Sequence, residues 1–178
     1  MNRRRSVEPP AGAVPGPPGA AVAVQVEVDV GDGAEVDDPQ RWGDLARSVL
    51  AAEGIVGPAE LSLSFVDEAA MAELNRRWMG EDGPTDVLSW SIDPPRASAR
   101  AQEPPVMLGD VVVCPAVARR ALVAGSRSLD DELALLVVHG VLHVLGLDHA
   151  EAADAAAMRA REHDHLTRFH DGRWTRTS

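Results

Sequence analysis

The stretch LDDELALLVVHGVLHVL, residues 129–145, decides the fold. It is apolar on nearly every side, which is typical of a helix buried inside a domain rather than laid on its surface. Ser128 precedes it and Asp131 follows three residues later, a spacing that resembles a capping box at a helix start. Gly146 comes directly after it, and glycine tolerates the left-handed conformation in which helices end. We therefore predict a buried central helix over residues 129–145.

Shorter segments on both sides of this helix predict a sheet and further helices. Apolar and polar residues alternate with the two-residue period of a half-buried strand in several of them. Helix starts are marked by an Asp-Pro pair at 38–39 and by Asp67. Strands and helices mix without strict alternation, so we predict an α+β fold, a single domain with about four strands in a mixed sheet packed with helices. The expected strands are 22–30, 61–65, 85–92 and 106–114, and the other helices are 39–53, 68–78, 115–124 and 151–169.

Length and composition predict one domain between two tails. The chain has 178 residues, of which 45% are hydrophobic, enough to bury a core without disulfides. Residues 1–20 form a Pro/Gly/Ala tail that we expect to be disordered, residues 21–170 form the domain, and residues 171–178 form a C-terminal tail. Prolines interrupt the N-terminal segment, so we read no export signal and expect a cytoplasmic protein. The longest apolar run, 133–147, contains two histidines and is shorter than the roughly 20 residues that cross a bilayer.

Charge and cysteine content limit the classes of partner. The formal net charge is −11, and all 17 basic residues are arginine, so the chain does not attract nucleic acid through its overall charge. Contact with RNA requires a local group of arginines. The single cysteine, Cys114, excludes an internal disulfide, fits a reducing compartment and is expected to be buried. Trp78 and Trp90 are also expected in the core, with base stacking as the alternative. The candidate phosphate contacts are Arg76, Arg77, Arg119, Arg120 and Arg127.

Three histidines at the end of the central helix predict a metal site. His139 and His143 are four residues apart, so on a helix they project from one face, one turn from each other. After the helix ends at Gly146, the chain can turn back and bring His149 to the same point. Three imidazoles around an open fourth position describe a catalytic zinc site. We expect one Zn²⁺ on these histidines, whereas the histidines of the last helix, His163, His165 and His170, are expected to be solvated.

The same ligand spacing occurs in metzincin peptidases, which makes a zinc peptidase the first alternative. Those enzymes need a glutamate directly after the first histidine, as the general base for water. Gly140 occupies that position here, so the peptidase base is missing. The sequence assigns no catalytic residue. Asp86 is either a candidate carboxylate for the reaction or a strand-start hydrogen-bond acceptor. Asp148 is expected either to orient a ligand histidine or to cap the turn.

Three segments resemble the YbeY family of endoribonucleases. The strongest is HGVLHVLGLDH at 139–149, which is similar to the family signature HGxLHLxGxDH. The second is PTDVLSW at 84–90, preceded by Leu74-Asn75, and the third is LGDVVVCP at 108–115. Their order and gaps match the family over about residues 21–170. Many members carry an arginine six residues before the threonine of the second segment, where this chain has Met79.

This resemblance implies a single-strand-specific endoribonuclease with one zinc held by His139, His143 and His149. It also implies a role in ribosomal RNA processing, in particular maturation of the 3′ end of the small-subunit RNA, and in ribosome quality control. The expected partners are ribosomal RNA and the ribosome or its proteins, with no DNA and no membrane. The second alternative is a non-catalytic ribosome assembly factor in which zinc is structural.

Overall fold

The computed structural model describes residues 24–94, 104–122, 127–147 and 152–170, and it confirms the α+β fold. The predicted tails, 1–20 and 171–178, lie outside the described residues. None of the described helices is both long and apolar enough to cross a membrane. The strands are β1 (Gln25–Val30), β2 (Ala59–Phe65), β3 (Val87–Ser91) and β4 (Val106–Val113), and the helices are α1 (Pro39–Ala52), α2 (Glu68–Trp78), α3 (Pro115–Ala121), α4 (Leu129–Val144) and α5 (Ala152–Phe169).

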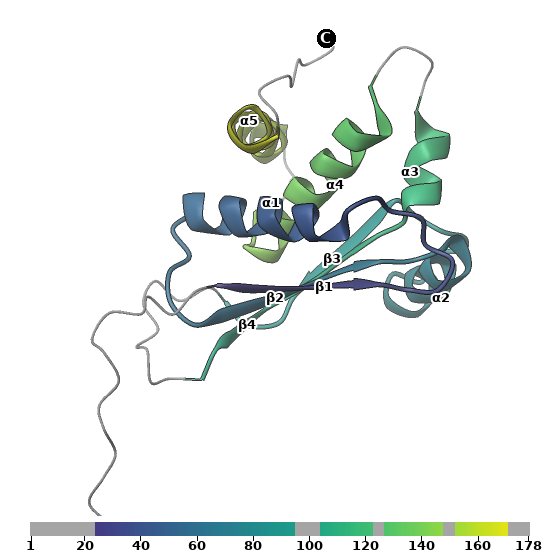
Figure 1. Cartoon of the computed structure of the whole chain (residues 1–178), viewed down its shortest axis with the longest axis horizontal. Helices are drawn as coiled ribbons and strands as arrows, with labels where there is room; N and C mark the ends of the chain where they lie inside the picture. Colours follow the sequence, from purple (N-terminus) through teal and green to yellow (C-terminus); the bar gives the residue numbers. More distant parts are fainter. Residues whose placement is uncertain (1–23, 95–103, 123–126, 148–151, 171–178) are drawn as a thin grey trace, which may run out of the picture.

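The strands form one mixed sheet in the order β1-β2-β4-β3. β1 runs parallel to β2 and β2 parallel to β4, whereas β3 returns antiparallel to β4 at the edge. Helices α1, α4 and α5 lie on one side of the sheet and α2 on the other (Figure 1). Side chains alternate between these two faces along each strand. In β4, for example, Val111 and Val113 join the larger core under α4, while Val112 joins the smaller core under α2.

Helix α4 is buried as predicted, and both of its ends have the expected caps. Ser128 and Asp131 form a reciprocal capping box at its start. At its end, Gly146 has a φ of 89°, and its N–H donates to the carbonyl of His143. The N–H of Leu147 donates to the carbonyl of Leu142, which completes a Schellman motif. The helix therefore stops one residue after the second predicted metal ligand, His143.

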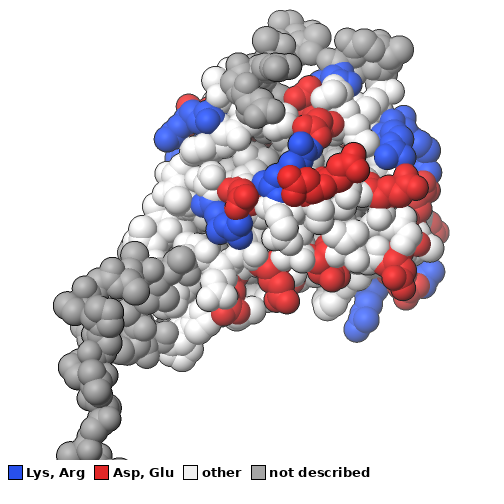
Figure 2. All heavy atoms as spheres, in the orientation of Figure 1, with Lys and Arg blue, Asp and Glu red and all other residues white. Residues whose placement is uncertain are grey.

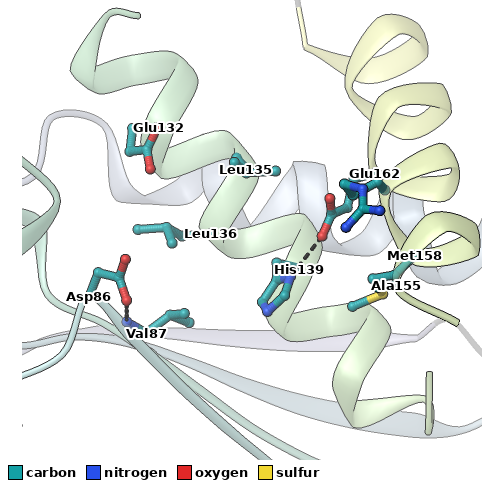
Figure 3. A pocket seen from close by; sticks show the side chains of 10 residues that line it. Asp86, Val87, Glu132, Leu135, Leu136, His139, Ala155, Met158 and Glu162 are labelled. Atoms are coloured by element: carbon teal, nitrogen blue, oxygen red, sulfur yellow. Dashed lines mark hydrogen bonds and ion pairs between the residues drawn. The ribbon is translucent and has the colours of Figure 1, made fainter. Parts of the chain in front are cut away.

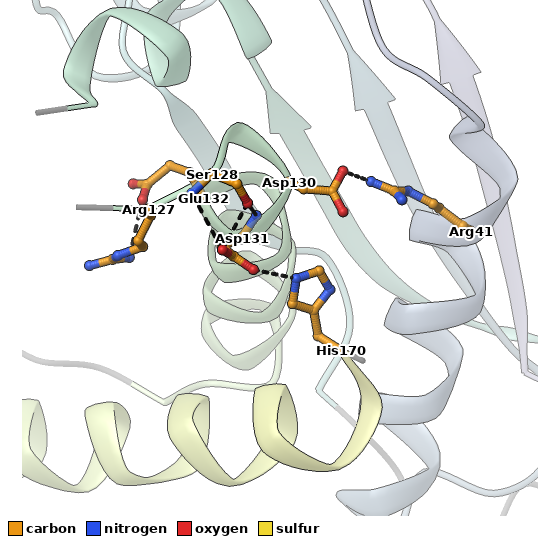
Figure 4. A network of polar contacts seen from close by, with 7 residues as sticks. All are labelled: Arg41, Arg127, Ser128, Asp130, Asp131, Glu132 and His170. Atoms are coloured by element: carbon orange, nitrogen blue, oxygen red, sulfur yellow. Dashed lines mark hydrogen bonds and ion pairs between the residues drawn. The ribbon is translucent and has the colours of Figure 1, made fainter. Parts of the chain in front are cut away.

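Polar contacts fix the N-terminal end of α4 to its neighbours (Figure 4). Asp130 forms an ion pair with Arg41 of α1. Asp131 lies 2.8 Å from Nε2 of His170, directly after α5. Burial raises the pKa of Asp131, but hydrogen bonds from Ser128 and His170 outweigh this effect and lower that pKa overall. These contacts hold α4 between α1 and α5.

The Asp38-Pro39 pair marks the start of α1 as expected, although Asp38 has a φ of 42° and makes no side-chain capping bond. Two other local expectations were wrong. Trp78 is 58% exposed rather than part of the core. His165 and His170 are not solvated, since the side chain of His165 is 3% exposed and that of His170 is 11% exposed.

Candidate functional site

His139 and His143 lie side by side on α4, as their spacing predicts. Their ring centroids are 4.5 Å apart, and the rings meet edge to face at 73°. Both side chains are partly exposed, on a helix that is otherwise mostly buried. His149 lies outside the described residues. Within the described ranges, no three His, Cys, Asp or Glu side chains gather closely enough to hold an ion, so the ligand set stays a prediction.

Glu162 of α5 contacts the first of these histidines. Its Oε1 lies 2.7 Å from Nδ1 of His139, and Glu162 is only 9% exposed. A carboxylate accepts the proton of Nδ1, which makes Nε2 the ring nitrogen with the lone pair. This is the arrangement found around metal-binding histidines, where a carboxylate fixes both the tautomer and the ring orientation. The donor set therefore fits a metal ion.

A cavity of about 410 Å³ opens beside His139. Its walls come from α4, from α5 and from the start of β3, and the side chains of His139 and Glu162 contact each other on one side of it (Figure 3). Asp86 reaches this cavity, and its Oδ1 accepts hydrogen bonds from the backbone N–H of Val87 at 2.9 Å and from the Thr85 hydroxyl at 3.2 Å. The strand-start role expected for Asp86 is thus present. The other lining residues are Glu132, Leu135, Leu136, Ala155, Met158 and Arg159.

Gly140 faces the sheet and not this cavity. A Cβ atom placed on it would lie 2.5 Å from Cγ1 of Val111 in β4. The position that carries the base in metzincin peptidases is therefore filled by contact between α4 and the sheet. A glutamate there would have to displace β4 rather than approach a water beside His139.

The arginines expected to contact phosphate are not gathered at this cavity. Four of them form ion pairs, namely Arg76 with Glu73, Arg119 with Glu35, Arg120 with Glu68 and Arg127 with Glu132. The fifth, Arg77, lies over the ring of Trp78, which stacks on Trp90 at 5.8 Å. On the face drawn in Figure 2, arginines and carboxylates lie beside one another, in keeping with such pairing.

Helix α5 is also held at a second buried histidine–carboxylate contact. Nε2 of His165 lies 2.7 Å from Oε1 of Glu53, which directly follows α1 and also pairs with Arg161. Burial raises the pKa of Glu53, but the hydrogen bonds from Arg161 and His165 prevail and lower it overall. This contact fixes the helix that carries Glu162, and no local pattern in the sequence indicates it.

Comparison with known proteins gives consistent matches. The family model described as Endoribonuclease YbeY matches residues 30–170. Proteins named Endoribonuclease YbeY from Salinispora tropica and Acidothermus cellulolyticus are 46% and 47% identical to this chain over 143 and 147 residues. These matches cover 77% and 80% of this chain and 90% and 89% of the two relatives.

Among solved structures, a Thermotoga maritima protein determined in solution superposes with a TM-score of 0.54 at 20% identity. The superposition covers 80% of this chain and 87% of that one. At this level of identity the likeness bears on the fold alone, whereas the sequence matches bear on the family.

Proposed function

This chain belongs to the YbeY family of endoribonucleases, and we propose that it is a single-strand-specific, metal-dependent endoribonuclease that processes ribosomal RNA. The observation that carries the proposal is the family match over residues 30–170, which includes every residue of the cavity beside His139. The expected substrate is the precursor of small-subunit ribosomal RNA rather than DNA. A cytoplasmic location and contact with the ribosome or its proteins belong to the same proposal, as does a single catalytic domain over residues 21–170.

The metal that we propose is one Zn²⁺ held by His139, His143 and His149. Three imidazoles suit several first-row metals, and zinc is proposed over iron or nickel on grounds of availability. When bound, such an ion supplies Lewis-acid polarisation of a phosphoryl oxygen and lowers the pKa of a water to about 7. The contact between the two described rings and the carboxylate on His139 support this assignment.

The chain's own residues orient the His139 ring and the Asp86 carboxylate in the cavity. Glu162 holds the His139 ring through Nδ1, and because Glu162 is largely buried, water competes poorly for that contact. Asp86 keeps its carboxylate at the opposite wall through its bond to the backbone of Val87. The apolar side chains between them, such as Leu136, limit the access of water to the space beside His139.

The experiment compares the purified full chain with its His143→Ala variant. Metal content is measured by elemental analysis, and folding by circular dichroism and thermal unfolding. Each protein is then incubated with a 3′-extended small-subunit RNA precursor, with the same RNA annealed into a duplex, and with casein. We expect wild type to contain zinc and to cleave only the single-stranded RNA, and the folded variant to lose both metal and cleavage.

Three outcomes would contradict the proposal. Cleavage of casein and not RNA would favour the zinc peptidase. RNA processing in cells that survives in a folded, metal-free His143→Ala variant would favour the non-catalytic assembly factor. A metal-free wild-type protein that cleaves RNA at full rate would remove the metal from the mechanism.

A further inference from the structure

The cavity beside His139 contains more negative than positive side chains, although the proposed substrate is an anion. Asp86, Glu132 and Glu162 all line it, and Arg159 of α5 is the arginine among its lining residues. A phosphodiester that enters this space therefore meets three carboxylates. Where the RNA strand binds depends on which of these charges are already compensated by partners within the protein.

Each of the three carboxylates has a partner. Glu162 contacts Nδ1 of His139 at 2.7 Å, and Glu132 forms an ion pair with Arg127 at 3.1 Å. Asp86 accepts a hydrogen bond from the next backbone N–H at 2.9 Å. These contacts partly compensate the three negative charges, and none of the contacts involves Arg159.

Arg159 differs from the other arginines of the described chain in having no ion pair, no hydrogen bond and no contact with an aromatic ring. Arg77, the other one without a carboxylate partner, lies over the ring of Trp78. Because Arg159 precedes Glu162 by three residues in α5, both side chains leave the same face of the helix. The eight arginines that pair with carboxylates are Arg41, Arg47, Arg76, Arg119, Arg120, Arg127, Arg161 and Arg168.

We propose that Arg159 binds a backbone phosphate of the single-stranded RNA in this cavity and so places the strand beside His139. The inference rests on the proposed function. A guanidinium forms two parallel hydrogen bonds to a phosphate, and an arginine that has no competing carboxylate makes that contact without first breaking an ion pair. Such a contact carries no sequence information, so it strengthens binding of every single-stranded RNA alike.

The test uses the zinc-loaded full chain and its Arg159→Gln, Arg159→Lys and Arg168→Gln variants. Arg168 is the matched control, because it lies on the same helix, is exposed, and pairs with Asp164 away from the cavity. Binding of short labelled oligoribonucleotides is measured by fluorescence anisotropy at several KCl concentrations. Metal content and the kcat and KM for RNA cleavage are measured on the same samples.

We expect Arg159→Gln to weaken binding about tenfold at low salt for every sequence tested, and to make the slope of log affinity against log salt shallower by about 0.7. Metal content stays at the wild-type level, and KM rises more than kcat falls. Arg159→Lys restores the slope because it keeps the charge, while Arg168→Gln matches wild type.

Two results would overturn the inference. One is an Arg159→Gln variant with wild-type affinity and salt slope, in samples whose wild type binds and cleaves RNA. The other is loss of metal from that variant, which would show a structural role for Arg159. If wild type itself neither binds nor cleaves RNA, the proposed function fails instead, and the two failures are thereby distinguished.

Discussion

Replacing Glu162 tests whether the carboxylate on His139 serves metal binding. In Glu162→Ala, the N–H at Nδ1 of His139 loses the acceptor that lies 2.7 Å away. Loss of such a carboxylate partner costs about tenfold to a hundredfold in metal affinity, equivalent to about 1.4 to 2.7 kcal/mol. The side chain of His139 is 27% exposed, so water replaces part of the lost contact, and we expect the lower end of that range. Glu162→Gln keeps an acceptor and is expected to lose less.

The assay is competition between the protein and a chromogenic chelator for Zn²⁺, together with thermal unfolding with and without the metal. Weaker binding also reduces the stabilisation that a given zinc concentration provides. Glu53→Ala is the matched control, because Glu53 also contacts a histidine of α5 at 2.7 Å but does not line the cavity. We expect it to lower the unfolding temperature and leave zinc affinity unchanged.

The reasoning is refuted if Glu162→Ala binds zinc as tightly as wild type. It is also refuted if both variants lose affinity equally, because the loss would then follow from general destabilisation of α5 rather than from the orientation of His139.

Three further predictions follow from the packing and the titration of buried groups. Gly140→Ala should destabilise the fold by about 1 to 3 kcal/mol in urea unfolding, because its Cβ would collide with Val111; an unchanged midpoint would contradict the close contact. The pKa of Glu53 is lowered in the folded protein, so ionised Glu53 stabilises the fold fully above its ordinary pKa of 4.5, and this stabilisation is lost as the pH falls through the folded-state pKa. In urea titrations from neutral to acidic pH, Glu53→Gln should therefore lose less stability than wild type. Burial raises the pKa of the Cys114 thiol, so iodoacetamide should label it only in denaturant, and labelling of the folded protein would show that it is accessible.

The central helix was predictable because its determinants are local. An apolar sequence, a capping box at Ser128 and a glycine at 146 lie within about twenty residues, and each acts through its immediate neighbours. The existence of a mixed sheet followed from alternating segments. The strand order did not, since placing β4 between β2 and β3 depends on contacts between distant parts of the chain.

The cavity wall opposite α4 could not be assigned from spacing alone. Glu162 is separated from His139 by 23 positions, and nothing local joins them. One signal was available, because Met158, Glu162 and Leu166 recur every four residues and all three are buried. A carboxylate in the middle of an apolar stripe needs a partner, and a histidine on the adjoining helix meets that need.

The close approach of α4 to the sheet at position 140 has an evolutionary consequence. Two kinds of hydrolase share the spacing of their histidines, and by that spacing alone they differ at one position, where one has a glutamate and this chain has Gly140. Here a change to glutamate must push a helix away from the strand beneath it, so intermediates along the route would be unstable before gaining any new chemistry. In this chain, steric packing at position 140 therefore opposes a conversion that the spacing of the histidines alone would permit.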